Sequence, residues 1–139
     1  AIVRKTQPKA IIFEYIHLQY LIPQNTSGCL MILDAHDIMH QRKETFKKRG
    51  WDHWLDINEK EELQIMSSFD VIMTIQNKEK EYLKTSLPSV NSIVVYHNHP
   101  IFPPTVKNNR ILNISFIGTQ AAPNEDAWVS ALATSSDFG

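Results

Sequence analysis

The stretch Cys29-Leu-Met-Ile-Leu-Asp-Ala-His-Asp-Ile-Met-His-Gln-Arg42 combines a short apolar run, a polar turn and the start of a helix. The run from Cys29 to Leu33 is typical of a central strand in a parallel sheet, where both faces of the strand are covered. Asp34, His36 and Asp37 follow directly, at the expected carboxyl end of that strand. Ligands of open α/β sheets bind at this end of the strands. The stretch therefore predicts a functional site around His36. The alternative is that Asp37 caps the helix that follows, with Asp34 a solvated acid and His36 a surface histidine.

The composition favours one globular domain with a hydrophobic core, because 42% of the 139 residues are hydrophobic and 21% are charged. The net charge is −1 and no basic stripe is present, which argues against a nucleic-acid partner. No apolar run approaches the roughly 18 residues of a membrane span, and the first residues lack the apolar core of a signal peptide. The single cysteine, Cys29, argues against a disulfide framework and is interpreted as a reduced core residue. Together these features predict a cytoplasmic protein.

Strand-like and helix-like segments alternate along the chain. Strands are expected at residues 10–13, 29–33, 70–75, 92–96 and 112–117. Helices are expected at residues 18–22, 38–48, 57–67 and 78–86, and again from Pro123. This alternation predicts an α/β fold with a Rossmann-like parallel sheet and helices on both of its faces.

The helix expected at residues 57–67 is preceded by the pattern of a capping box, formed by Asp56 and Glu59. The acidic residues of its first turn, Glu59, Glu61 and Glu62, are expected to face mostly solvent. The loop before it contains Trp51 and Trp54, which could stack on a ligand. A loop folded back on the core is the favoured interpretation of these two tryptophans.

Several ordered motifs carry a family resemblance. Ile11-Ile-Phe-Glu-Tyr15 looks like a strand with a trailing acid, and Asp34-Ala-His-Asp37 with Arg42 looks like a His-Asp…Arg turn. Glu61 or Glu62, then Ser68-Phe-Asp-Val-Ile-Met-Thr-Ile75 and Glu79, look like a Glu…Ala-Asp-x-Val…Ser…Glu block. Phe116-Ile-Gly-Thr119, followed by Pro123-Asn124 and Ala127, looks like a strand, a glycine loop and a helix. In this order, the motifs resemble the retaining glycosyltransferases of the GT-B fold (family 4-like, group 1).

The resemblance implies a fragment of a two-domain enzyme. Residues 1–104 would be part of the acceptor-side Rossmann-like domain, and residues 105–139 the hinge and the first β-α unit of the donor-side domain. The family's glycine-rich first loop and its donor-binding acidic pair would lie outside residues 1–139. The isolated fragment is therefore predicted to be inactive.

The resemblance also implies a reaction. Members transfer a sugar from a nucleotide-diphosphate sugar to a glycan or lipid acceptor, as in polysaccharide biosynthesis, with retention of anomeric configuration and without a metal or other cofactor. It allows peripheral association of the full-length enzyme with a membrane, and no nucleic acid takes part.

Two residues would form the catalytic turn by this analogy. His36 would hydrogen-bond the transferred sugar or the acceptor, because imidazole offers a donor and an acceptor near neutral pH, and Asp37 would cap and orient the turn. Gly118 would let the backbone approach the donor phosphates ahead of a helix N-terminus, although simple turn chemistry explains this glycine about as well. The substrate-binding residues implied are Glu14, Arg42, Gly118, Thr119 and Asn124.

Two other functions stay open on the sequence. A metal-dependent phosphoesterase or hydrolase would use nitrogen and oxygen ligands from Asp34, His36, His40, His97 and His99, with two metals binding a phosphate. The other is a non-catalytic α/β module that binds a nucleotide or a protein partner.

Overall fold

A computed structural model describes residues 5–23, 28–96 and 121–135 of the chain. It separates into two compact units, Ala1–His99 and Pro100–Gly139, which are described one by one. The first unit contains all the described strands, and the described part of the second contains helix α5 (Ala122–Ser135). No helix among the described residues is both long and apolar enough to cross a bilayer.

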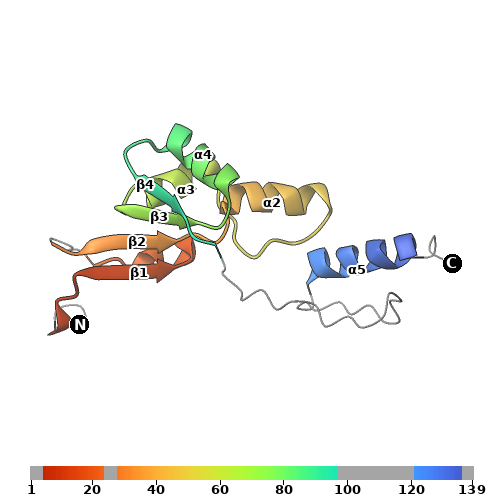
Figure 1. The fold of residues 1–139 in the computed structure, drawn as a ribbon, viewed down its shortest axis with the longest axis horizontal. Helices are drawn as coiled ribbons and strands as arrows, with labels where there is room; N and C mark the ends of the chain where they lie inside the picture. The colour runs from red at the N-terminus through yellow and green to blue at the C-terminus, as the bar shows by residue number, and fades with distance from the viewer. Residues whose placement is uncertain (1–4, 24–27, 97–120, 136–139) are drawn as a thin grey trace, which may run out of the picture. The chain divides into compact units, whose positions relative to one another are not determined.

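The first unit is built on a four-stranded parallel sheet of strand order β1-β2-β3-β4 (Figure 1). The strands are β1 (Ala10–Glu14), β2 (Leu30–Asp34), β3 (Val71–Thr74) and β4 (Asn91–Val94). The remaining elements are the 3-10 helix η1 (Ile16–Leu21) and the helices α2 (Met39–Lys48), α3 (Glu59–Met66) and α4 (Asn77–Ser86). The predicted α/β class, the parallel sheet and its first four strands are confirmed. The strand predicted at residues 112–117 lies outside the described residues.

One face of the sheet forms the core. The buried side chains of β1, β2 and β3 alternate with exposed or half-buried ones, as expected for a strand with a period of two. Residues of the helices complete a single cluster with them, which includes Phe13, Leu33 and Ile72 from the strands and Ile16, Met39, Met66 and Leu83 from the helices. Parallel crossovers are nearly always right-handed, so connections that advance in one direction along a sheet bring their helices to the same face.

The opposite face of the sheet is apolar and open among the described residues of this unit. Ile12 is 62% exposed, and Leu30 and Ile93 are also exposed. Parallel sheets usually bury both faces. The second layer of helices expected from the sequence stays a prediction.

Helix α3 begins two residues later than the sequence pattern predicts. Its N-cap is Asn58, whose side chain accepts a hydrogen bond from the Glu61 backbone N–H at 3.0 Å, while Glu61 accepts one from the Asn58 backbone at 3.1 Å. The capping box expected at Asp56 and Glu59 is therefore wrong, because the observed box lies two residues further along the chain. Asp56 instead pairs with Lys43 of α2, and this contact lowers the pKa of its carboxyl group.

Candidate functional site

The candidate site is built at the carboxyl ends of β1 and β2. Glu14 and Asp34 are the last residues of these strands and lie opposite each other in the parallel register. The Tyr15 backbone N–H donates to the Asp34 carbonyl at 2.9 Å, so the pairing continues past Glu14. The two acids are therefore brought together at the sheet edge where α/β proteins bind their ligands.

His36 and Tyr15 form the centre of this site. Their rings stack with centroids 4.1 Å apart and an angle of 12° between the planes. Both residues have positive backbone φ angles, 57° for His36 and 67° for Tyr15. Left-handed backbone is unfavourable for residues other than glycine and is retained where the surroundings require it, often at functional sites.

The free edge of the His36 ring faces the two strand-end acids. Its Nε2 lies 3.7 Å from a Glu14 carboxylate oxygen and 3.8 Å from an Asp34 oxygen, both longer than a hydrogen bond. The Nε2 atom is buried, and among the described residues it has no hydrogen-bond partner. A buried polar atom without a partner is unusual in a folded protein and calls for an explanation, such as a ligand.

Asp37 and Arg42 form an ion pair next to His36. The Arg42 guanidinium also lies over the Phe46 ring, 5.3 Å from its centroid. The predicted cap is wrong, because α2 begins at Met39 with Ile38 at the N-cap and no side-chain capping bond from that residue. Asp37 is one position too early to cap this helix, and its carboxylate is engaged by Arg42 instead.

Glu79 of α4 lies close to this turn. Burial raises the pKa of its carboxyl group, and the negative charge of Asp37 raises it further. The backbone N–H groups of Ile38, Ile75 and Gln76 act in the opposite direction. Glu79 therefore contacts the backbone of both the loop after β2, at Ile38, and the loop after β3, at Ile75 and Gln76. Its place in the sequence was recognised only through the family resemblance.

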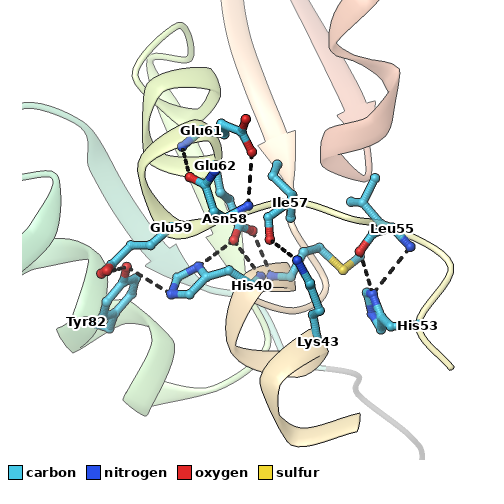
Figure 2. A network of polar contacts seen from close by, with 11 residues as sticks. His40, Lys43, His53, Leu55, Ile57, Asn58, Glu59, Glu61, Glu62 and Tyr82 are labelled. Atoms are coloured by element: carbon cyan, nitrogen blue, oxygen red, sulfur yellow. Dashed lines mark hydrogen bonds and ion pairs between the residues drawn. The ribbon is translucent and has the colours of Figure 1, made fainter. Parts of the chain in front are cut away.

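The N-terminus of α2 is capped by a side chain from α3, as Figure 2 shows. Glu62 accepts hydrogen bonds from the backbone N–H groups of Met39 at 2.7 Å and His40 at 2.8 Å. Its second contact with His40 is to the ring, where Oε2 lies 2.6 Å from Nδ1. A carboxylate at a helix N-terminus satisfies unpaired donors and interacts favourably with the helix dipole.

The expectation that the acids of α3 face solvent is wrong for Glu62, whose side chain is 0% exposed. Glu62 precedes the buried Met66 by one helical turn, so both lie on the face of α3 that packs inward. This i, i+4 relation was the sequence signal that could have revealed it. Glu59 and Glu61 are exposed, as predicted.

The polar network continues from His40 to α4. The Tyr82 hydroxyl lies 3.5 Å from His40 Nε2 and donates to Glu59 at 2.8 Å (Figure 2). Burial, followed by the bond to Glu59, raises the pKa of Tyr82 to about 12. His40 thus directs its ring nitrogens at Glu62 and Tyr82.

The remaining predicted site residues fall outside the described residues or in the second unit. Gly118, Thr119, His97 and His99 lie outside the described residues. Asn124 is in the first turn of α5, where its backbone N–H donates to the Ala121 carbonyl at 2.9 Å, and it belongs to the second unit. Among the described residues, no three His, Cys, Asp or Glu side chains are grouped to bind a metal ion. The metal-site hypothesis stays a prediction.

The two tryptophans of the loop after α2 have different environments. Trp51 is half-buried against Phe46, with ring centroids 5.4 Å apart, as the favoured interpretation predicted. Trp54 is 61% exposed, so that interpretation is wrong for it. Its ring meets His17 edge-on with centroids 5.0 Å apart.

Comparison with known proteins adds no relative to this description. No family model matches the chain, and neither a search of curated proteins nor a search of solved structures returns a match.

Proposed function

We propose that this chain is part of a retaining glycosyltransferase of the GT-B type, which transfers a sugar from a nucleotide-diphosphate sugar to a glycan or lipid acceptor. The parallel sheet supports the proposal at the level of the fold. The strand-end site supports it at the level of chemistry. The chain would act in the cytoplasm, where nucleotide sugars are available.

The observation that carries the proposal is the unpaired Nε2 of His36 beside two carboxylates. A sugar hydroxyl can both donate and accept a hydrogen bond. A neutral imidazole nitrogen can do either according to its tautomer, and Glu14 and Asp34 offer acceptors next to it. This combination suits a hydroxyl-rich ring better than an apolar or anionic ligand.

The surrounding residues would keep the His36 ring in place. Tyr15 stacks on one of its faces, and the turn that carries it is followed by the ion pair of Asp37 with Arg42. Preorganised hydrogen-bonding groups contribute more to catalysis than mobile ones, because less reordering is needed when the reaction occurs. Arg42 has further guanidinium donors that could meet a phosphate oxygen of the donor. Gly118, Thr119 and Asn124 would contribute on the donor side.

The test is sugar transfer by the native polypeptide that contains this chain. The assay measures release of the nucleoside diphosphate from a panel of nucleotide sugars, with hydrolysis measured in parallel. We expect His36→Ala to reduce turnover by at least about tenfold, which is a minimum, because loss of one catalytic group typically costs about 10²-fold or more. Tyr20→Ala is the matched control, because Tyr20 is a 74% exposed aromatic residue on η1.

Two results would contradict the proposal. One is equal turnover by wild type and His36→Ala, which would return His36 to a structural role. The other is the absence of transfer from every nucleotide sugar tested with the native polypeptide. Turnover by residues 1–139 alone would contradict the separate prediction that this fragment is inactive.

A further inference from the structure

A row of aromatic rings leads away from His36 along the molecular surface. Tyr15 stacks on His36, and its ring centroid lies 5.7 Å from that of His17. His17 in turn meets Trp54 at 5.0 Å. The row connects the candidate site to a tryptophan that is 61% exposed.

The loop that carries Trp54 is anchored on both sides. The ring of His53, immediately before it, has Nδ1 2.8 Å from the Leu55 carbonyl. Lys43 of α2 pairs with Asp56. Its Nζ also lies 3.4 Å from the Ile57 carbonyl, a contact that Figure 2 shows. Trp54 is therefore exposed from a loop that is tied to α2, and its side chain needs no large rearrangement to meet a ligand.

A shallow groove of about 540 Å³ adjoins this tryptophan. Its lining residues are Gln19, Leu55, Asp56, Ile57, Glu61, Gln64, Ile65 and Ser68. Gln19 is on η1 with His17, and Leu55 directly follows Trp54, so the groove continues from the aromatic pair. Five of these eight residues carry amide, carboxylate or hydroxyl groups, and the other three are apolar.

We propose that Trp54, His17 and this groove bind a glycan chain, with one sugar ring on the indole and further sugars in the groove. The face of an indole is apolar and electron-rich, so it complements the C–H face of a pyranose ring. The amides and carboxylates of the groove would then bind the hydroxyls at the rim of the sugars. If the proposed function is right, this surface is where the acceptor lies before it reaches His36.

The lining favours a glycan over a membrane surface. Asp56 and Glu61 are carboxylates, so they would repel anionic lipid headgroups. The neutral hydroxyls of a glycan, by contrast, can donate hydrogen bonds to both of these carboxylates.

The experiment measures glycan binding by the 139-residue chain without any nucleotide sugar. The chain has three tryptophans, Trp51, Trp54 and Trp128, so the double variant Trp51→Phe/Trp128→Phe leaves Trp54 as the only indole reporter. Its fluorescence is titrated with hexasaccharides of glucose, mannose, galactose and N-acetylglucosamine. We expect a saturable change in Trp54 emission with at least one of them.

Saturation-transfer NMR then compares variants of the otherwise unaltered chain. We expect Trp54→Ala to weaken binding of the same hexasaccharide at least about tenfold, as is usual for an aromatic anchor of an interface. Trp51→Ala is the matched control, because Trp51 lies on the same loop but packs against Phe46. Circular dichroism of each variant checks that the fold is retained.

Three results would overturn the inference: no saturable binding of any hexasaccharide, equal effects of Trp54→Ala and Trp51→Ala, or a response of Trp54 to phosphatidylglycerol vesicles alone. The proposed function fails independently, because it depends on turnover and on His36.

Discussion

Glu62 on α3 and His40 on α2 are joined twice, since the Glu62 carboxylate lies 2.6 Å from His40 Nδ1 and accepts the His40 backbone N–H at 2.8 Å. A third bond, from the Met39 backbone N–H, completes its contacts with the first turn of α2. The helix that follows the candidate site is thus held in place by a residue 22 positions further along the chain. Removing this carboxylate tests how strongly the site depends on the packing of α3.

The change Glu62→Ala should strongly reduce the free energy of unfolding. It leaves two backbone donors and a ring nitrogen without their partner in a buried position, and losses of this kind cost about 3 kcal/mol or more. Chemical denaturation measures the difference. The control is Glu44→Gln, an exposed acid on α2, for which we expect a change within about 0.5 kcal/mol. Equal stabilities of the two variants would contradict the capping role of Glu62.

Tyr82 should make the stability of the chain fall at alkaline pH. Its pKa is raised to about 12 in the folded chain, compared with 10.0 for the unperturbed group. The folded state therefore retains a proton that the unfolded state loses between these values. The stabilisation is fully present below about pH 10 and is lost as the pH rises towards 12.

The comparison of wild type with Tyr82→Phe isolates this effect from the other alkaline groups. We expect the difference in unfolding free energy between the two proteins to change with pH only above about pH 10, the unperturbed pKa of the phenol. Phenolate absorbance provides a second measurement, because one of the tyrosines should titrate late in wild type and be missing in the variant. A pH-independent difference would show that the Tyr82 proton is not held more tightly in the folded state.

Most of the sheet could be predicted because each strand is a local pattern. Short apolar runs bounded by turn residues locate β2 and β3, and the alternation with helices implies the parallel arrangement. The position of Asp34 and His36 at a strand end also followed from the local pattern, whereas Glu14 was included as a site residue only through the family resemblance. Local patterns determine these features without knowledge of tertiary contacts.

The rest of the site depends on contacts between residues that are distant in sequence. Glu62 belongs to an acidic turn of four residues, Glu59-Lys-Glu-Glu62, and only the packing of α3 on α2 shows which acid is buried. The exposure of Trp54 is likewise decided by how its loop is tied to α2, which neighbouring residues do not reveal. Nothing in the sequence indicated the positive φ of His36, because glycine is the residue that usually marks this conformation.

The pKa of Glu79 should respond to the charge of Asp37. After burial, Asp37 is the largest cause of the raised pKa of this carboxyl group. Asp37→Asn should therefore lower the pKa of Glu79, which NMR titration of the carboxyl carbon can follow. Asp34→Asn is the control, since Asp34 is not among the groups that shift Glu79. Equal titration of Glu79 in wild type and Asp37→Asn would contradict this coupling.

A raised pKa also implies that ionised Glu79 opposes folding. The stabilisation by its protonated form is fully present below the ordinary value of 4.5 and is lost as the pH rises through the folded-state pKa. The neutral variant Glu79→Gln should therefore be more stable than wild type at pH 7, with the advantage disappearing towards pH 4. Denaturation at both pH values measures this, and a variant that is less stable at pH 7 would show that the backbone bonds to the carboxylate outweigh its burial.

Stability and activity should respond differently to substitutions of His36. Its φ of 57° is unfavourable for alanine by about 1 kcal/mol, whereas glycine adopts this conformation readily. His36→Gly should therefore be more stable than His36→Ala, although both lose the stack on Tyr15. Transfer by the native polypeptide should fall to a similar extent in both variants, because neither supplies a nitrogen at the position of Nε2. If His36→Gly recovered activity together with stability, the role of His36 would lie in the shape of the turn and not in its ring.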